Sequence, residues 1–305
     1  MAIKSVTATI NGQTVTLEDK GNGTYSKVLT APTRTSYNVN SGHYYPVEIV
    51  ATNMAGTATV VNDSHATLGS YCKLVVKEVT APTITISQPT SGQYFAVANP
   101  EIKFTLVDEA NGSGVAISTL SIKLDGTTYT NTSNGVTVTS ISNGYSVVFK
   151  PSATLKDGSH TLVVSVEDND GNLATSASIS FTTDTVAPTL NVTNPSTNGS
   201  YTSEATLVVT GTASDSTSGT PTVTVKLNSG SAEAVTVSNG SFSKTVTLAN
   251  GSNTIVVTAT DKAGKVTTIT RTIILDTSAP VVAAISITPN PVDVGGSYTV
   301  TVTVS

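Results

Sequence analysis

The chain has 305 residues, of which 11% are charged, and its formal net charge is −5. This length predicts about two or three domains. No apolar run approaches the roughly 18 residues of a membrane-spanning helix, and no cluster of Lys and Arg marks a nucleic-acid surface, so we expect neither membrane insertion nor a nucleic-acid partner.

The composition favours strands over helices. Thr and Val supply 56 and 40 of the residues, whereas Leu supplies only 15. β-branched side chains fit a pleated sheet better than a helix. The single cysteine, Cys72, forms no internal disulfide, so every domain must rest on its apolar core. We expect Cys72 itself to be filler in a core or at a sheet edge.

Two alternating units open the chain and then recur. They occupy residues 6–10 and 47–51, and they return at residues 120–124 and 162–166 and again at 223–227 and 255–259. In each unit every second residue is apolar, which is the pattern of a half-buried strand. The chain therefore contains three copies of one structural repeat.

Linkers separate these copies. Each linker ends in Ala-Pro, at Pro82, Pro188 and Pro280, with spacings of 106 and 92 residues. Proline suits a junction or a strand start because it cannot donate to a sheet ladder. About seven short strands per repeat predict an all-β fold of tandem antiparallel β-sandwiches. We predict modules at residues 1–79, 80–185, 186–277 and 278–305.

Repeats two and three resemble the bacterial immunoglobulin-like (Big-type) modules strung along surface adhesins. The resemblance rests on the Ala-Pro linkers, on the Ser-Gly pairs at residues 113–114 and 218–219, and on strands that end in Asp-x-x-Gly. It implies tandem immunoglobulin-like sandwiches, and it implies no single function because this fold serves many.

The two ends of the chain look incomplete. Residues 1–79 lack the first two strands of the repeat, A and B, whereas residues 278–305 offer only those two, at 285–287 and 298–304. Together the two ends amount to 107 residues, close to one repeat. Three interpretations stay open: the C-terminal pair completes the N-terminal module of a neighbouring copy, a fourth module continues beyond residue 305, or residues 1–79 fold alone with the help of residues 60–71.

Residues suited to catalysis are scarce. The three histidines lie apart in sequence, no Gly-x-Ser-x-Gly elbow is present, and no His/Cys cluster has zinc spacing. His160 occupies the position of Asn253 in the third repeat, so we interpret it as a surface residue at a strand start. We expect no enzyme and no required cofactor.

Carboxylates are better placed. In an immunoglobulin sandwich the B–C and F–G loops lie at the end where the chain enters, so acids of the linker and of both loops should converge there. Calcium favours such oxygen ligands. The alternative is that these acids only cap turns and keep the surface soluble. The candidate calcium ligands are Glu78, Asp108, Asp168 and Asp170 in repeat two, with Glu109 beside them, and Asp184, Asp215 and Asp261 in repeat three.

Aromatic residues concentrate in the first quarter of the chain. Tyr and Arg favour interfaces because they bury apolar area and keep a polar tip. A docking or glycan-stacking surface is therefore predicted there, with tyrosines that pack the strand ends as the alternative. The candidate interface residues are Arg34, Tyr37, His43, Tyr44 and Tyr45, together with Tyr298, Val300 and Val302 of the C-terminal strands.

Three functions compete. Residues 1–46 and 287–292 resemble immunoglobulin-like proteins encoded with the tail genes of phages of Gram-positive bacteria, which implies a virion component that self-associates or binds other virion proteins and touches host-surface carbohydrate weakly. The chain shows no secretion signal, which suits a product released by lysis. The alternatives are a fragment of a bacterial cell-surface adhesin with calcium-stiffened repeats, and an accessory region of a glycan-active enzyme.

Overall fold

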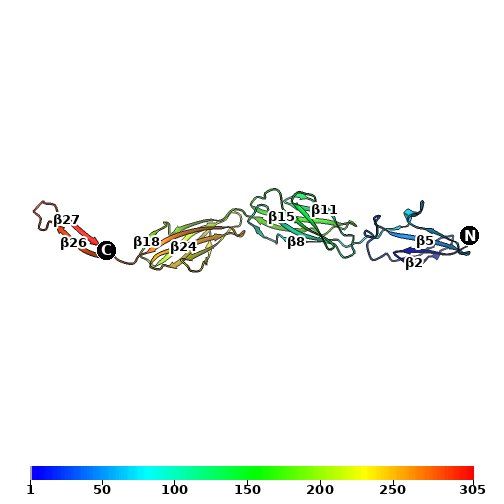
Figure 1. Ribbon diagram of the computed structural model, residues 1–305, viewed down its shortest axis with the longest axis horizontal. Helices are drawn as coiled ribbons and strands as arrows, with labels where there is room; N and C mark the ends of the chain where they lie inside the picture. Colours follow the sequence, from blue (N-terminus) through cyan, green and yellow to red (C-terminus); the bar gives the residue numbers. More distant parts are fainter. Residues whose placement is uncertain (1) are drawn as a thin grey trace. The chain divides into compact units, whose positions relative to one another are not determined.

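The computed structural model describes residues 2–305. It forms two compact units, residues 1–183 and residues 184–305. Both are built from strands that pair mostly antiparallel, with one parallel pair among the described strands of each unit (Figure 1). Within the described residues the only helical element is a single 3₁₀ turn, η1 (Gly69–Tyr71), and no helix is long and apolar enough to cross a membrane. The predicted all-β fold is confirmed.

The first unit begins with a single five-stranded sheet, here called the N-terminal sheet. Its order is β2-β1-β5-β6, with β7 paired to β5. A separate pair, β3–β4, lies outside this sheet. The bounds are β1 (Ile3–Ile10), β2 (Gln13–Thr16), β3 (Glu18–Asp19), β4 (Tyr25–Ser26), β5 (Tyr45–Asn53), β6 (Ala58–Val61) and β7 (Lys73–Leu74).

The rest of the first unit is a two-sheet sandwich, here called the second sandwich. One sheet has the order β13-β14-β10-β8 and the other β12-β11-β15-β16-β9. The bounds are β8 (Thr83–Gln88), β9 (Tyr94–Phe95), β10 (Ile102–Val107), β11 (Val115–Leu124), β12 (Thr127–Tyr129), β13 (Val136–Ile141), β14 (Gly144–Phe149), β15 (Gly158–Asp168) and β16 (Ala177–Thr183).

The second unit holds another sandwich, the third sandwich, and a hairpin. The sandwich sheets have the orders β17-β19-β23-β22 and β18-β25-β24-β20-β21, and β26 pairs only with β27. The bounds are β17 (Thr189–Asn194), β18 (Ser200–Thr202), β19 (Thr206–Ser214), β20 (Thr222–Leu227), β21 (Glu233–Val235), β22 (Val237–Ser238), β23 (Ser241–Thr247), β24 (Gly251–Thr260), β25 (Val266–Leu275), β26 (Val282–Thr288) and β27 (Thr299–Val304).

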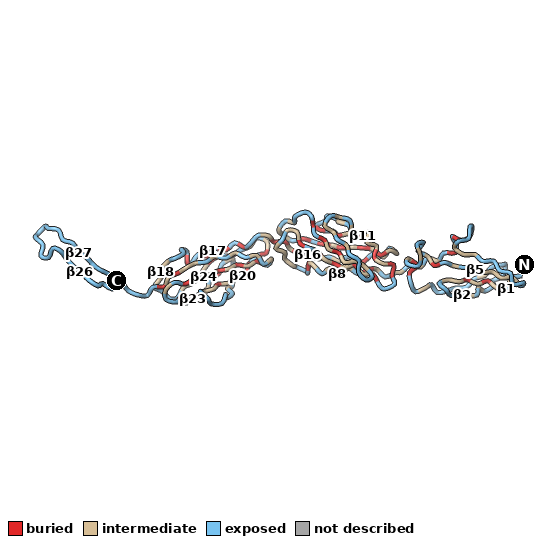
Figure 2. Tube along the Cα trace, in the orientation of Figure 1, coloured by how far each residue is buried: buried red, intermediate tan, exposed pale blue. Residues whose placement is uncertain are grey.

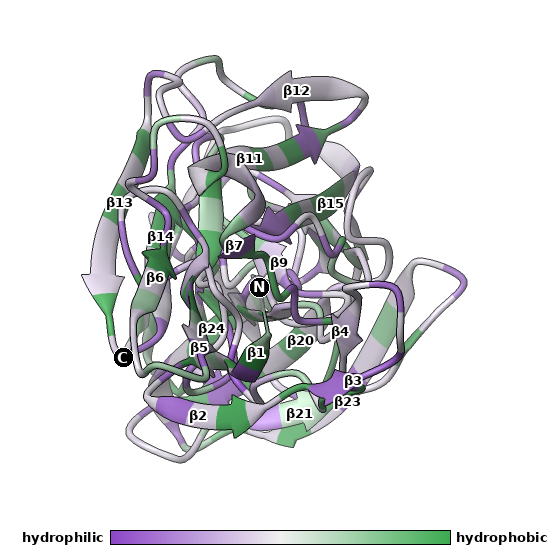
Figure 3. Cartoon of the chain, turned by 90° about the vertical axis from the view of Figure 1, so that its right-hand side faces the viewer, coloured by the Kyte–Doolittle hydropathy of each residue, from purple (hydrophilic) through white to green (hydrophobic). Residues whose placement is uncertain are grey.

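Alternation along the strands makes the two sandwich cores. Hydrophobic bands recur along β11 in Figure 3, and the residues that face inward are almost fully buried. Phe104 of β10 is 1% exposed and Val164 of β15 is 0% exposed, so the two sheets cover each other's apolar faces. Figure 2 shows buried segments in both sandwiches, whereas the β26–β27 hairpin is exposed along its whole length.

Candidate functional site

Three acids of the second sandwich meet where the linker enters it. Glu78 comes from the linker, Asp108 follows β10, and Asp168 ends β15. One carboxylate oxygen from each lies within 4.8 Å of the other two, and both aspartates are buried. These three residues, the first triad, come together as the loop positions predict.

Hydrogen bonds orient the first triad. The amide of Ser113 donates to Glu78 Oε1, and the amide of Gly114 donates to Asp108 Oδ2 at 2.6 Å. Asp168 Oδ1 accepts the amides of Asp170 and Asn172 at 2.9 and 2.8 Å. Asp168 Oδ2 accepts the side-chain amide of Asn172 at 2.7 Å. Hydrogen bonds therefore account for one oxygen each of Glu78 and Asp108 and for both oxygens of Asp168. Glu78 Oε2 and Asp108 Oδ1 are buried, and no hydrogen-bond partner for either lies among the described residues.

A fourth acid shares the negative charge of the first triad. The neighbouring carboxylate of Glu78 is the largest influence that raises the pKa of Glu109 from 4.5 to about 7, followed by burial and by Asp108. A carboxyl that keeps its proton near neutral pH reports a site with more negative charge than its partners neutralise. The same charge would be neutralised by a cation.

The third sandwich repeats the arrangement as a second triad. Asp184 of the linker, Asp215 after β19 and Asp261 after β24 have oxygens within 4.8 Å of one another. Asp184 is 0% exposed, and within residues 2–305 neither of its carboxylate oxygens has a hydrogen-bond partner. Asp261 Oδ2 is also buried and unpartnered, although Asp261 Oδ1 accepts the Lys265 amide at 2.8 Å.

Burial and hydrogen bonding act in opposite directions on the pKa values of the second triad. Burial raises the pKa of Asp184, and the carboxylates of Asp215 and Asp261 raise it further. Burial also pushes the pKa of Asp215 upward, but the amides of Ser218 and Thr217 outweigh it and leave that pKa below its usual value. An ionised Asp215 thus faces a carboxyl that resists ionisation, which is how crowded carboxylates behave without a counterion.

Asp170 lies outside the first triad. Its Oδ2 accepts the Thr35 hydroxyl at 2.5 Å and the Glu78 amide at 3.1 Å. Asn38 also donates to the carbonyl of Gly112 at 2.8 Å. Asp170 therefore ties residues that follow β4 to the loops of the second sandwich. The sequence gives no signal for the contacts of Thr35 and Asn38, because they join segments of separate repeats.

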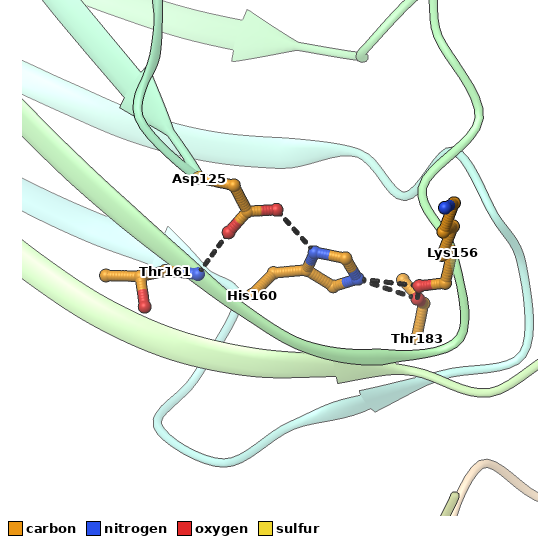
Figure 4. A network of polar contacts seen from close by, with 5 residues as sticks. All are labelled: Asp125, Lys156, His160, Thr161 and Thr183. Carbon is orange, nitrogen blue, oxygen red and sulfur yellow. Dashed lines mark hydrogen bonds and ion pairs between the residues drawn. The ribbon is translucent and has the colours of Figure 1, made fainter.

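His160 is buried, and its interpretation as a surface residue is wrong. Figure 4 shows its ring between Asp125 and the pair formed by Lys156 and Thr183. Nδ1 lies 2.6 Å from Asp125 Oδ2, and Nε2 lies 2.9 Å from both the Lys156 carbonyl and Thr183 Oγ1. The equivalent Asn253 is 0% exposed. The strand start is a core position whose polar side chain is satisfied internally.

The aromatic cluster divides into buried and surface residues. Tyr45 is 4% exposed and donates to the Arg34 carbonyl at 3.1 Å, so the prediction that it lies on a docking surface is wrong. It precedes Val47 by two residues, as His160 precedes Leu162, and therefore fills the same strand-start position. Tyr37 stacks on His43 with ring centroids 4.1 Å apart, and Tyr44 donates to Asp63 at 2.8 Å.

The remaining predicted residues fall in two places. Cys72 is buried after η1, in agreement with its interpretation as filler. Tyr298 precedes β27, and Val300 and Val302 lie within it, with exposed fractions of 59%, 52% and 49%. The two predicted C-terminal strands are thus present as a hairpin.

Comparisons with known proteins agree with this fold. Residues 97–185 match the bacterial Ig-like domain family, and residues 188–277 match glucodextranase domain B. No curated protein matches the chain.

Several solved structures are similar to the chain. Fibronectin(III)-like modules of CbhA from Clostridium thermocellum are 18% identical, with 64% of this chain and 94% of that chain covered and a TM-score of 0.38. A 1.5-MDa bacterial ice-binding adhesin, studied for host cell surface retention, is 24% identical, with 90% and 88% covered and a TM-score of 0.33. Bacteroides ovatus SGBP-B, bound to a mixed-linkage heptasaccharide, is 15% identical, with 94% and 66% covered and a TM-score of 0.23.

Modules of this fold are generally non-enzymatic and are typical of adhesins and other surface proteins. The two complete sandwiches, the Ala-Pro linkers and the family matches point to one conclusion. The chain carries immunoglobulin-like modules in tandem, and residues 97–185 match the bacterial Ig-like domain family.

Proposed function

We propose that the chain is a non-enzymatic structural and adhesive protein whose linkers are locked to its immunoglobulin-like modules by divalent cations. The observation that carries this proposal is that a linker acid meets loop acids at both complete sandwiches, with buried, unpartnered oxygen atoms in each triad among the described residues. Asp184 is fully buried there, whereas Glu78 is partly buried. Such oxygens cost several kcal/mol of folding free energy unless a proton or a cation compensates them. Calcium, which takes carboxylate and carbonyl oxygens, is the candidate cation.

The proposed mechanism is mechanical. Glu78 and Asp184 belong to the linkers, whereas the other triad acids belong to loops of the module that follows. A cation held by both would fix the linker on its module and remove the repulsion between the acids. Cation binding would then appear as folding free energy, because the unfolded chain does not hold the acids together.

Cation removal tests this proposal. We expect EDTA to lower the melting temperature of the sandwiches by on the order of 10 °C, because a ligand at about 100 times its Kd adds about 2.7 kcal/mol. Added Ca²⁺ should restore it. Scanning calorimetry on the full chain measures both, and a melting temperature indifferent to EDTA and Ca²⁺ would reject the cation.

A matched pair of variants localises the effect. Asp184→Asn removes a triad charge and should abolish the cation response of the third sandwich. Asp276→Asn changes the acid of the third linker, which is exposed and accepts only the Ser278 amide at 3.0 Å among the contacts found for its side chain. This control should keep the full response. A lost response in the control, or a retained one in Asp184→Asn, would place the cation elsewhere.

The setting that we propose for this protein is a phage virion, as the resemblance of residues 1–46 and 287–292 implies. Many copies on a particle would turn weak contacts with host-surface carbohydrate into avidity. The residues available for such contacts include the stacked Tyr37 and His43. Mass spectrometry of purified particles tests this setting.

A bacterial surface adhesin is the second candidate, favoured by the triads because cation-stiffened linkers suit a long surface protein. Recovery of the chain from bacterial envelopes, and its absence from particles, would support this alternative. Neither outcome bears on cation binding, which the calorimetry decides separately.

A further inference from the structure

The β26–β27 hairpin presents an uncovered apolar face. Ile285 pairs with Val302 and Ile287 pairs with Val300, so these four side chains share one face of the hairpin. Ser286 and its partner Thr301 lie on the other. The two isoleucines are 65% and 46% exposed, and Figure 2 shows no buried residue in the hairpin. A two-stranded hairpin is marginally stable in water, so this face needs a partner.

The N-terminal sheet lacks the cover that its counterparts have. Ile10 pairs with Val47, as Leu124 pairs with Leu162 in the second sandwich. Leu124 and Leu162 are 3% and 0% exposed, whereas Ile10 and Val47 are only half-buried. The pair at this end of the strands is therefore closed off in the second sandwich and only partly covered in the N-terminal sheet, although Val6 and Ala8 farther along β1 are 9% and 4% exposed.

The segment that follows β4 is also left without a neighbour. In the second sandwich Phe149 of β14 is 0% exposed and pairs with Ile102 of β10. The matching residue, Leu29, is 40% exposed. Among the described strands β4 pairs only with β3, so its other edge offers free backbone groups.

A cavity marks the missing strand. It has a volume of about 650 Å³ and is lined by apolar and polar residues from the sheet and from the segment after β4, with Asn11, Gln13 and Lys27 among the polar ones. In the complete sandwiches the second strand, β10 or β19, pairs antiparallel with β14 or β23 and sends its side chains between the sheets. The residues that line the cavity include Ile10, Val15, Leu29, Ala31, Pro32 and Leu74.

We propose that the β26–β27 hairpin of one copy completes the N-terminal sheet of a second copy. β27 lies antiparallel to the segment after β4, supplies the missing backbone hydrogen bonds, and places Val300 and Val302 in the cavity. The hairpin fits this role because β26 and β27 pair as β8 and β10 do, and β26, like β8, ends just before a proline. The contact joins two different surfaces, so it closes into a ring or extends as a filament.

The inference rests on the structural role proposed above and names how copies join. The hairpin contains no triad residue, so its test is separable from that of the cation. Calorimetry with EDTA decides the cation, and oligomer mass decides the joint.

Sedimentation of the full chain in Ca²⁺ tests the joint. We expect mass to rise with protein concentration. Val302→Asp puts a charge into the cavity and should weaken association by about a hundredfold. Thr301→Asp, on the opposite face, should leave it unchanged. A parent chain that stays monomeric, or two variants that associate equally, would overturn the proposal. Unchanged melting of the sandwiches in both variants shows that folding is intact.

Cross-linking identifies the partner. One preparation carries Leu29→Cys and the other, distinguished by a mass tag, carries Val302→Cys, and the two are mixed, unfolded and refolded together. We expect a disulfide between the tagged and untagged copies, and none when Val302→Cys is replaced by Thr301→Cys. Association without this cross-link would assign the hairpin to another surface and defeat the proposal.

Discussion

The N-terminal sheet and the second sandwich use the same strand pattern with different results. Their matching central strands have equal register, since Ile10 lies opposite Val47 as Leu124 lies opposite Leu162. Only the second sandwich has a second sheet with long strands, and only there are the inward residues fully buried. Strand pattern and register are therefore set locally, whereas the core is made by the layer that covers them.

The difference also shows how one position adapts to its surroundings. The strand-start residue is Tyr45 in the N-terminal sheet, His160 in the second sandwich and Asn253 in the third. All three are buried, and each contacts a backbone carbonyl, at 3.1, 2.9 and 2.7 Å respectively. The position requires a buried side chain with a polar group that can hydrogen-bond a backbone carbonyl of a nearby loop. Tyrosine, histidine and asparagine fulfil this requirement although they differ in size.

The largest expected effect is on the cores themselves. Val164→Ala in the second sandwich should lower the free energy of unfolding by about 2–3 kcal/mol, because a cavity opens in a closed core. Ile49→Ala, the matched change in the N-terminal sheet, removes more atoms but should cost only about 1 kcal/mol, because Ile49 is half-buried. Native-state hydrogen exchange of β15 and β5 measures the two losses locally.

Protein concentration sharpens that comparison. At concentrations where the chain is monomeric, the losses of unfolding free energy in Val164→Ala and Ile49→Ala should differ most. Where copies associate, the hairpin of a neighbour covers Ile49 and the cost of Ile49→Ala should approach that of Val164→Ala. Equal costs at every concentration would show that the N-terminal sheet already has a complete core.

A smaller effect is expected at the strand-start position. His160→Leu leaves Asp125 Oδ2 without its partner and removes one of the two side-chain contacts of the Lys156 carbonyl, which still accepts the Thr183 hydroxyl. The variant should cost about 1–3 kcal/mol. His160→Asn, which adopts the residue of the third sandwich, should cost less. Tyr45→Phe, which loses one hydrogen bond, should cost about 1 kcal/mol. Thermal unfolding ranks the three, and a harmless His160→Leu would show that the network adds nothing to stability.

The sequence predicts those features that depend on local pattern. Alternation and turn residues place the strands, and the loop positions of a sandwich bring Glu78, Asp108 and Asp168 together. Loop position alone does not separate Asp168 from Asp170, two residues later, because which acid points inward depends on how Asp168 caps the turn at its own strand end.

Contacts between segments that are far apart in sequence lie beyond such reasoning, whether within one repeat or between two. His160 looks like a surface residue because its partner Asp125 belongs to a distant turn, and only the folded sheet brings them together. Thr35 reaches Asp170 across more than a hundred residues. These contacts depend on how layers and loops meet, which no periodicity records.

The smallest expected effect is a dependence of stability on pH. It arises from the acids of the second sandwich, and we do not expect it in the N-terminal sheet. With EDTA present, folded Glu109 holds its proton up to a pKa of about 7, whereas its usual value is 4.5. Between these values the folded chain binds more protons than the unfolded chain, so stability falls as pH rises and the loss is complete above about 7. The effect is modest because the Glu109 side chain is exposed.

Melting temperatures taken across this interval should therefore decline less steeply in Glu109→Gln than in the parent chain. Asp184, whose pKa is also raised by burial, adds a decline of the same sign from the third sandwich in both proteins, so the difference between the two slopes isolates Glu109. Ca²⁺ should flatten the parent profile, because a cation favours the ionised acids that a proton otherwise neutralises. Identical slopes of melting temperature against pH in the two proteins would show that Glu109 does not belong to the acid cluster. Amide hydrogen-exchange rates in β5 that follow the same pH profile would show that the N-terminal sheet and the second sandwich unfold together.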